Sequence, residues 1–277
     1  MSNDRNFADP SLLDALTEIA SRASLAIMDV RKRGAEVRTK ADSSPVTEAD
    51  EAAEAIILDG LAQILPGIDV VSEEAATRVK TEQLSDTFIL VDPLDGTREF
   101  IEDRDEFTVN IAIIANGQPV CGVVGAPALS TIWRGAVGLG AERLHLPAGL
   151  AVKDATQRTQ LIAQPHQGGA WRAVVSRSHL DPKTEQWLQR FAQVERVDCG
   201  SSVKFCRIAE GAADVYPRLG RTSEWDIAAG HAVLTAAGGV VLTPEGGTLP
   251  YGQVDRDLKV PSFVAWCSAA DARRYAV

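Results

Sequence analysis

The sequence has few of the features that mark secreted, membrane-spanning or nucleic-acid-binding proteins. Its four cysteines are widely spaced and form no CxxC pair, which argues against a zinc knuckle or a disulfide framework and favours reduced thiols. No run approaches the roughly 18 apolar residues that span a bilayer, and the first residues lack the pattern of a signal peptide. We predict a cytoplasmic protein without an integral membrane segment, and leave peripheral membrane association open.

Positive charge is also scarce. The 28 lysines and arginines are outnumbered by 38 acidic residues, which gives a formal net charge of −10. This balance argues against a nucleic-acid polymer as partner, since that surface would need a basic field. A small anionic substrate remains compatible with the charge if metal ions or local basic residues neutralise the site. With 277 residues, 45% of them apolar, the chain can form one large domain or two smaller parts that share a core.

The first half of the chain predicts two helices followed by a sheet. Asp9 and Pro10 form a helix start, and apolar residues at steps of three and four extend this helix to about Gly34. Thr47 is the expected N-cap of a second helix, which stops at Pro66–Gly67. An antiparallel meander with a turn at Gly117 is expected next. Its predicted strands are Ile68–Val71, Phe88–Val91, Thr108–Ile114, Val120–Val124 and Thr131–Trp133.

Beyond a polar segment from about Pro147 to Gly169, strands and helices alternate. This segment is the predicted junction between an α+β metal-binding part, 1–150, and an α/β nucleotide-binding part, 151–277, within one compact unit. The alternation is typical of an α/β layer. The expected elements are strands at Ala173–Ser176, Val194–Val197, Asp214–Tyr216 and Val240–Leu242, and helices near Pro182–Phe191, Ser202–Ala209 and Glu224–Ala237.

Three acidic groups stand where predicted strands or loops end. They are Ser72-Glu73-Glu74, the segment Asp92-Pro-Leu-Asp95-Gly-Thr97, and Asp226. Mg²⁺ prefers several oxygen ligands in octahedral geometry and usually also binds substrate phosphate. Two aspartates three residues apart, with a proline fixing the turn between them, can direct both carboxylates to one place and expose the Leu94 carbonyl. The pattern therefore favours a metal site for phosphate chemistry.

Each group also has a purely structural interpretation. Asp95-Gly96 is a common turn dipeptide, and a Glu-Glu pair usually belongs to a solvated loop. Asp226 lies three residues after Ser223 and Asp50 lies three residues after Thr47, so each aspartate could complete a helix cap.

The full set of motifs resembles the lithium-sensitive, Mg²⁺-dependent inositol monophosphatase superfamily. The order and spacing agree from about Leu12 to the C-terminus. The resemblance implies an α/β fold, a layered αβαβα sandwich with the metals clamped between an α+β N-terminal part and an α/β C-terminal part. The matching segments are Pro45-Val-Thr-Glu-Ala-Asp50, Ser72-Glu-Glu74, Val91-Asp-Pro-Leu-Asp-Gly-Thr97 and Trp225-Asp-Ile-Ala-Ala-Gly230.

Further segments are similar to one branch, the bacterial 3′(2′),5′-bisphosphate nucleotidases. Membership implies removal of the 3′-phosphate from adenosine 3′,5′-bisphosphate to give AMP, a step that clears a by-product of sulfate assimilation. Arg98 stands where the branch often has lysine, which keeps the positive charge. The segments are Thr97-Arg-Glu-Phe-Ile101, Glu106-Phe-Thr-Val-Asn110, Ser176-Arg-Ser-His179, Gly200-Ser-Ser-Val-Lys-Phe-Cys206, Tyr216-Pro-Arg218 and Ala229-Gly-His-Ala232.

The resemblance also implies the metal ligands. Glu73, Asp92 and the Leu94 carbonyl would hold one Mg²⁺, and Asp92, Asp95 and Asp226 would hold a second. A weaker third ion would lie near Glu73, which is therefore expected to serve catalysis as well. Glu74 is expected to lie behind the ligands without binding metal itself.

The catalytic and substrate contacts implied by the resemblance involve both parts. Asp50 would pair with the Thr97 hydroxyl to orient and deprotonate the attacking water, while Gly96 and Thr97 would hold the scissile phosphate. The expected nucleotide contacts are Ser176, His179, Ser202, Lys204 and Arg218, of which Lys204 and Arg218 suit the remaining 5′-phosphate. For His179 a helix cap or a surface hydrogen bond is an equal alternative, and for Ser202 a helix N-cap. His231 and Trp225 are expected to pack rather than act.

Three other functions remain open at the level of sequence. An inositol-phosphate or sugar-bisphosphate phosphatase of the same superfamily would keep the metal residues and change the second half. A haloacid-dehalogenase-type enzyme would need a DxDxT pattern, whereas here the acids are three apart with Pro93 between them. A non-catalytic Mg²⁺- or nucleotide-sensing module could dispense with Asp50 or Thr97, yet both are present.

Overall fold

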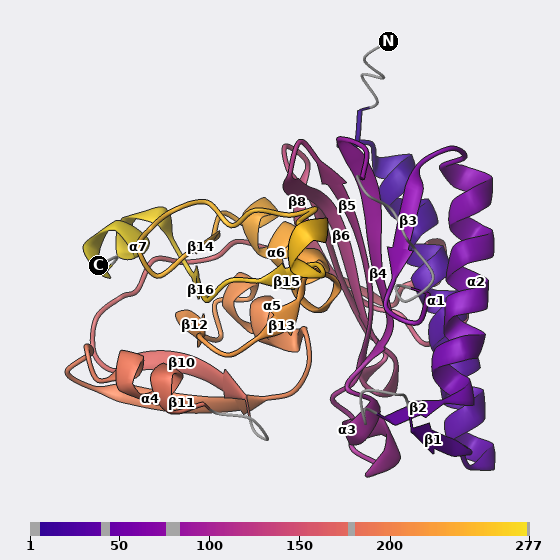
Figure 1. Cartoon of the computed structure of the whole chain (residues 1–277), viewed down its shortest axis with the longest axis horizontal. Helices are drawn as coiled ribbons and strands as arrows, with labels where there is room; N and C mark the ends of the chain where they lie inside the picture. The colour runs from indigo at the N-terminus through magenta and orange to yellow at the C-terminus, as the bar shows by residue number, and fades with distance from the viewer. Residues whose placement is uncertain (1–5, 40–44, 76–83, 177–180, 276–277) are drawn as a thin grey trace.

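The computed structural model describes residues 6–39, 45–75, 84–176 and 181–275, arranged in alternating helical and sheet layers (Figure 1). Two long helices cover the outer face of a large sheet, and further helices separate that sheet from a smaller one. One apolar cluster joins the long helices to the large sheet, and a second fills the space between the two sheets. The third lies on the outer face of the smaller sheet. The predicted αβαβα layering is confirmed.

The large sheet has seven strands in the order β3-β4-β5-β6-β7-β8-β9. From β4 to β9 all neighbours are antiparallel, as the predicted meander requires, whereas β3 departs from it and lies parallel to β4. The β5–β6 turn uses Asn116 and Gly117, both with positive φ, which suits a tight hairpin. The strands are β3 (Asp69–Ser72), β4 (Thr87–Asp95), β5 (Thr108–Ala115), β6 (Gln118–Ala126), β7 (Thr131–Ala136), β8 (Gly140–His145) and β9 (Gln157–Leu161).

The long helices begin as their capping residues predict. Asp9 accepts a hydrogen bond from the Ser11 amide and starts α1 (Pro10–Arg33), which ends at Gly34 with φ +84°. Thr47 caps α2 (Glu48–Ile64). Ahead of this helix, the short strands β1 (Val37–Thr39) and β2 (Pro45–Thr47) pair with each other. Because Thr47 ends β2 and caps α2, the start of this helix is fixed beside the large sheet.

The smaller sheet has the strand order β11-β10-β12-β16-β14. The first three strands are parallel, and β16 lies antiparallel between β12 and β14. The strands are β10 (Trp171–Ser176), β11 (Val194–Cys199), β12 (Val215–Arg218), β14 (Val240–Leu242) and β16 (Phe263–Trp266). The associated helices are α4 (Pro182–Leu188), α5 (Val203–Ala209), α6 (Glu224–Ala236) and α7 (Ala269–Tyr275).

Several elements were not predicted. The strand β9 falls inside the segment expected to be a junction, so the large sheet extends past residue 150, and the division at 150/151 stays a proposal. The strand β16 and the helix α7 lie beyond the last predicted element. Short pieces complete the chain: α3 (Thr97–Ile101), the paired β13 (Thr222–Ser223) and β15 (Lys259–Val260), and 3₁₀ turns at Pro127–Leu129, Val152–Asp154 and Val254–Arg256.

All four cysteines are free and buried, as expected for reduced thiols. In the described part of the chain, no helix combines the length and apolarity that crossing a bilayer requires.

Candidate metal and phosphate site

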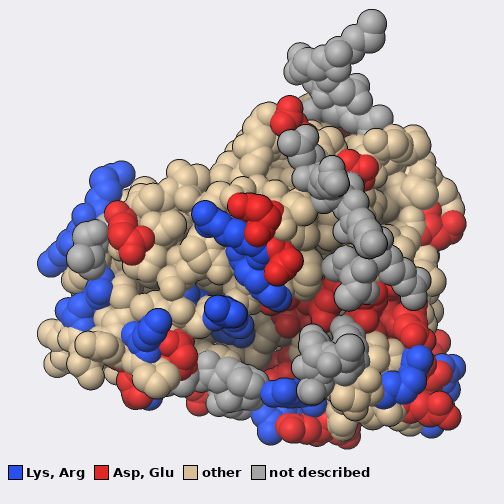
Figure 2. Space-filling view, viewed as in Figure 1, with Lys and Arg blue, Asp and Glu red and all other residues tan. Residues whose placement is uncertain are grey.

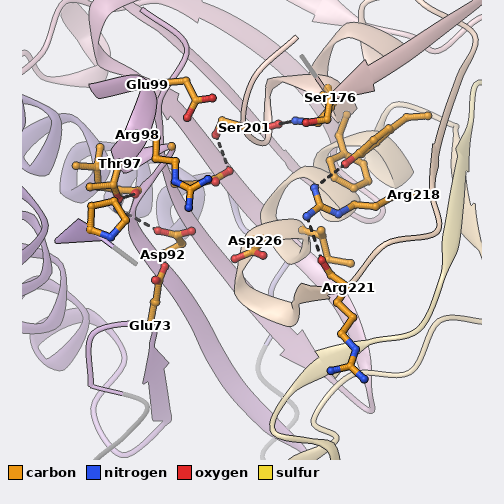
Figure 3. Close-up of a pocket in the computed structure, with 18 residues that line it drawn as sticks. Glu73, Asp92, Thr97, Arg98, Glu99, Ser176, Ser201, Arg218, Arg221 and Asp226 are labelled. Atoms are coloured by element: carbon orange, nitrogen blue, oxygen red, sulfur yellow. Dashed lines mark hydrogen bonds between the residues drawn. The ribbon is translucent and has the colours of Figure 1, made fainter. Parts of the chain in front are cut away.

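A cleft of about 520 Å³ lies where the two sheets approach each other (Figure 3). Its walls come from sequence segments far apart in the chain, including the ends of β3 and β4, the start of α6 and the strands β10 and β12. The lining residues are Pro45, Glu73, Asp92, Leu94, Asp95, Gly96, Thr97, Arg98, Glu99, Ser176, Ser201, Lys204, Phe205, Tyr216, Arg218, Arg221, Asp226 and Ile227.

Three carboxylates converge at the floor of the cleft. Oxygen atoms of Glu73, Asp92 and Asp226 all lie within 4.8 Å of one another. Glu73 directly follows β3 and Asp92 is in β4; because these strands are parallel neighbours, their carboxyl ends meet at one edge of the sheet. Asp226 arrives from the opposite side, in the first turn of α6. The structure therefore brings together acidic groups that are up to 153 positions apart, from Glu73 to Asp226.

The electrostatics of this cluster fit a hard cation. Burial raises the pKa of Asp92 well above its usual value, and the nearby carboxylates of Glu73, Asp95 and Asp226 raise it further. Burial and Asp95 also raise the pKa of Asp226, against hydrogen bonds from Thr222 and Ser223 that lower it. Such a cluster is stable in its anionic form only when positive charge compensates it. An all-oxygen donor set is the type that divalent cations such as Mg²⁺ prefer, so the residues present fit a metal site.

The raised pKa of Asp92 predicts how pH and metal affect stability. Without metal, the folded state holds more protons than the unfolded one between the usual pKa of 3.8 and the raised value, so stability should fall as pH rises through that window. Mg²⁺ at 100 times its Kd should add about 2.7 kcal/mol to the free energy of unfolding. We expect thermal unfolding to show a clear Mg²⁺-dependent increase in Tm at pH 7.5 and a smaller one at pH 5, where protons compete for the carboxylates. Equal increases at both pH values would contradict this interpretation.

The sequence predicts a turn after Asp92, but this segment stays in β4, with an irregular register between Asp92 and Asp95. Asp92 Oδ1 accepts a hydrogen bond from the Leu94 amide at 3.1 Å, which holds the irregular backbone around Pro93. Gly96 has φ +94°, and a Cβ there would lie 3.1 Å from the Glu106 carbonyl oxygen. Glycine is therefore required both by the backbone conformation and by the close approach of the neighbouring loop. The end of β4 and the start of α3 leave the side chains of Asp95 and Thr97 on the cleft wall.

Asp50 is buried, caps a helix and contacts Thr97, which lines the cleft. Its Oδ2 accepts hydrogen bonds from the amide and the hydroxyl of Thr47, each at 2.8 Å, and so completes the capping box of α2. Its Oδ1 accepts from the Thr97 hydroxyl at 3.2 Å. The same hydroxyl lies 3.2 Å from the Leu94 carbonyl oxygen. The two interpretations of Asp50 are thus compatible, because each uses a different oxygen.

Asp226 follows the same arrangement at the start of α6. Its Oδ2 accepts hydrogen bonds from the Ser223 amide, at 2.9 Å, and from the Thr222 hydroxyl. This capping box fixes the carboxylate against its own helix and turns it toward Glu73 and Asp92. Trp225 packs in the core beside it, as predicted.

Asp95 is held from the C-terminal part. Its Oδ2 accepts a hydrogen bond from the Ser201 hydroxyl at 2.5 Å, and the Ser202 hydroxyl lies 3.3 Å away. Asp95 lines the cleft but is not among the three residues whose oxygens converge within 4.8 Å. The alternative interpretation of Ser202 as a capping side chain is wrong: Ser202 stands at the N-cap position of α5, but its side chain makes no capping hydrogen bond.

Two cations face the carboxylates across the cleft. Lys204 is buried, and its Nζ donates to the Ser201 carbonyl oxygen at 2.7 Å and lies over the Tyr216 ring. Arg218 donates to the Tyr216 hydroxyl at 3.4 Å and to the Arg221 carbonyl oxygen at 3.2 Å. The neighbouring Tyr216 hydroxyl and the more distant carboxylates of Asp226 and Asp95 raise the pKa of Arg218, against burial, so it stays charged. Figure 3 shows Arg218 and Arg221 on the side opposite Glu73 and Asp92.

Charge is unevenly distributed on this face of the molecule. Figure 2 shows acidic side chains gathered in a recess on this face, with lysines and arginines along its edges. A cation at the recess is therefore favoured by the wider field as well as by the direct ligands.

The remaining predicted residues are placed as follows. Ser176, at the end of β10, lines the cleft, whereas Ser202 is 2% exposed and is not among the lining residues. Glu74 lies in the turn after Glu73, outside the lining set. His179 lies outside the described residues. His231 is packed, as expected: its Nδ1 lies 2.9 Å from the Tyr251 hydroxyl, and burial lowers its pKa to about 3.

Several cleft residues were not singled out from the sequence. Ser201 was visible beside Ser202 in the Gly-Ser-Ser segment, but residue type does not say which of two adjacent serines faces the cleft. Arg221 belongs to no motif that marks a site, and Glu99 lies in the Thr97–Ile101 segment, in which only Thr97 was expected to act. Thr222 donates to Asp226 although it lies just outside the expected helix.

Comparisons with known proteins agree with this geometry. A model described as the inositol monophosphatase family matches residues 9–273. The 3′(2′),5′-bisphosphate nucleotidase CysQ of Escherichia coli is 42% identical over 243 residues, which are 87% of this chain and 94% of that protein. The protein of the same name from Haemophilus influenzae is 31% identical over 256 residues, 91% of each chain.

Solved structures give the same picture. The crystal structure of CysQ from Bacteroides thetaiotaomicron, titled a bacterial member of the inositol monophosphatase family, superposes with a TM-score of 0.77 at 35% identity. It covers 94% of this chain and 98% of its own. Inositol monophosphatase from Anabaena superposes with a TM-score of 0.70 at 24% identity, over 96% of this chain and 94% of its own. This similarity supports the same fold.

Proposed function

This chain belongs to the inositol monophosphatase family, and we propose that it is a 3′(2′),5′-bisphosphate nucleotidase that converts adenosine 3′,5′-bisphosphate to AMP and phosphate. The observation that carries the proposal is the pairing of opposite charges across one cleft. A carboxylate cluster suited to metal-bound phosphate faces Lys204 and Arg218, which suit a second phosphate. A monophosphate would leave these cations uncompensated, whereas a bisphosphate uses both walls.

The cofactor we propose is Mg²⁺, as two or three ions. Glu73, Asp92 and the Leu94 carbonyl would hold one ion, Asp92, Asp95 and Asp226 a second, and Glu73 would border a weaker third. When bound, such ions lower the pKa of coordinated water and neutralise the charge that develops on the phosphate and on the leaving oxygen.

The residues of the chain supply the remaining steps. The Asp50–Thr97 hydrogen bond places a hydroxyl and a carboxylate where a water molecule could be oriented toward phosphorus. Asp50 Oδ1 can accept the proton from that water through the Thr97 hydroxyl, while Oδ2 stays fixed by the cap of α2. The new P–O bond forms as the ester bond to the 3′-oxygen breaks. Gly96 and Thr97 hold the transferred phosphate, and no covalent phosphoenzyme is needed.

The opposite wall would determine specificity. Ser176 lines the cleft on the side of Arg218, where it can contact the sugar (Figure 3). Lys204 and Arg218 would bind the 5′-phosphate, with Arg218 able to do so bidentately. His179 stays a predicted nucleotide contact. We place the enzyme in the cytoplasm, consistent with four free thiols.

Removing one of the two cations tests the proposal. Lys204→Ala should raise KM for adenosine 3′,5′-bisphosphate by about tenfold or more, because a charge-assisted hydrogen bond contributes about 1.5–3 kcal/mol. The kcat should change much less, and activity on inositol 1-phosphate, which has no second phosphate, should hardly change. Lys153→Ala, an exposed lysine far from the cleft, is the matched control. Unchanged KM values for the bisphosphate in Lys204→Ala would refute this assignment.

A further inference from the structure

The Ser202 hydroxyl occupies a junction between three elements around the cleft. It accepts a hydrogen bond from Asn110 Nδ2 at 2.9 Å, on strand β5. It lies 2.7 Å from the Asp226 main-chain carbonyl oxygen, in the first turn of α6, and 3.3 Å from Asp95 Oδ2, at the end of β4. Its single proton can be donated to either acceptor, the nearer Asp226 carbonyl or, after rotation about the Cβ–Oγ bond, Asp95 Oδ2. Asp95 and Asp226 are two proposed ligands of one metal ion, and Ser202 contacts the carboxylate of the first and the main-chain carbonyl of the second.

Burial separates Ser202 from the substrate space. Ser202 is 2% exposed and Asn110 is 1% exposed, and neither lines the cleft. The neighbouring Ser201, which does line it, bonds Asp95 Oδ2 at 2.5 Å, and its hydroxyl is 2.5 Å from that of Thr108. Because Ser201 donates to Asp95, Thr108 is the donor to Ser201. Ser201 therefore donates to Asp95 Oδ2 and Ser202 lies 3.3 Å from the same oxygen, but only Ser201 lines the substrate space.

The loop that carries the serines is held firmly in this position. Ser201 has φ +51°, in the left-handed region that non-glycine residues seldom adopt. The Gly200 amide donates to Glu106 Oε2 at 3.2 Å, and a Cβ at Gly200 would lie 2.9 Å from the Glu106 Cβ. A strained backbone conformation is kept only where surrounding contacts stabilise it, and such positions are often functional. Here the strained loop places the hydroxyls of Ser201 and Ser202 beside the Asp95 carboxylate.

We propose that Ser202 is a positioning residue for the metal ligands Asp95 and Asp226, and not a contact for the nucleotide. Hydrogen bonds to metal-binding carboxylates fix their orientation, and losing them typically weakens metal affinity 10- to 100-fold. Ser202 contacts Asp95 from the N-terminal part and Asp226 from the C-terminal part. The second metal site is therefore complete only when the two parts are in contact at Ser202. The inference rests on the proposed function for the existence of that site.

Metal binding without substrate tests the inference directly. Ser202→Ala should weaken Mn²⁺ binding about tenfold, measured by electron paramagnetic resonance of unbound Mn²⁺, and should raise the Mg²⁺ concentration for half-maximal phosphate release similarly. At saturating Mg²⁺, KM for the bisphosphate should change less than twofold. Unchanged Mn²⁺ affinity, with or without a raised KM, would overturn the proposal.

Two further variants keep the result interpretable. Ser24→Ala removes a buried serine of α1 that lies outside the cleft and should leave Mn²⁺ affinity unchanged; an equal loss in both alanine variants would overturn the proposal. Should Ser202→Ala fail to fold, Asn110→Ala removes the donor to Ser202 from the other side and should also weaken Mn²⁺ binding, whereas wild-type affinity would overturn the proposal. The proposed function fails separately, if the wild-type protein binds no Mn²⁺ or releases no phosphate from the bisphosphate.

Discussion

Asp95→Asn and Asp226→Asn should each lower kcat for phosphate release by at least about a thousandfold. Each change removes one negative charge from the proposed second metal site but keeps the shape of the side chain and an oxygen that can accept hydrogen bonds. Losing metal stabilisation of the leaving oxygen removes several kcal/mol, and about 4 kcal/mol corresponds to a thousandfold. The measurement is initial-rate phosphate release at saturating Mg²⁺ and bisphosphate.

The same variants should remain folded. Asp95 and Asp226 help to raise the pKa of Asp92, so removing either charge relieves repulsion in the metal-free cluster. We expect the metal-free Tm of Asp95→Asn to equal or exceed that of the wild type, despite the lost activity. Asp59→Asn, on the exposed face of α2, is the control that should keep full activity. Full turnover in Asp95→Asn would disprove its assignment as a metal ligand.

Thr97→Val should lower kcat about 100-fold or more, because it removes the hydroxyl that bonds Asp50 while keeping the branched shape. Positioned proton transfer contributes about 10²–10⁴-fold to catalysis. Thr97→Ser retains the hydroxyl and should keep most of the activity. Asp50→Asn should match Thr97→Val in kcat, since both break the same proton path.

A measurement of Mn²⁺ binding distinguishes the role of Thr97 and Asp50 from that of the proposed metal ligands. Neither Thr97 nor Asp50 is a proposed ligand, so Mn²⁺ affinity in Thr97→Val should stay close to that of the wild type. A variant that lost Mn²⁺ binding together with activity would show that Thr97 supports the metals rather than the water.

The helix starts could be predicted because their signals are local. Asp9-Pro10 and Thr47 mark α1 and α2 correctly. For Asp50 and Asp226 the sequence allowed two roles, a helix-capping residue or a residue of the metal and phosphate site. In the structure, Oδ2 of each carboxylate makes the capping hydrogen bonds. The other oxygen of Asp50 meets Thr97, and Asp226 contributes an oxygen to the converging cluster. A carboxylate has two acceptor atoms, so the alternatives need not exclude each other.

What could not be predicted depends on contacts between distant segments. The strand β9 reads Gln-Arg-Thr-Gln-Leu and is mostly exposed at the edge of the sheet, so it lacks the apolar run that marks a strand. The strand β16 enters the smaller sheet between β12 and β14, a position that no local pattern specifies. The Ser201 side chain faces the cleft because its backbone is left-handed. That conformation depends on the contact between the preceding Gly200 and Glu106, which lies far away in the sequence.

The most direct test of the central claim is a comparison of two substrates. We would measure kcat/KM for phosphate release from adenosine 3′,5′-bisphosphate and from inositol 1-phosphate, with Mg²⁺, in the presence and absence of Li⁺. The proposed function predicts a preference for the bisphosphate of at least about 100-fold, since two charge-assisted contacts at 1.5–3 kcal/mol each are lost with the monophosphate. It also predicts dependence on Mg²⁺ and inhibition by Li⁺. Equal or greater kcat/KM for inositol 1-phosphate would contradict it.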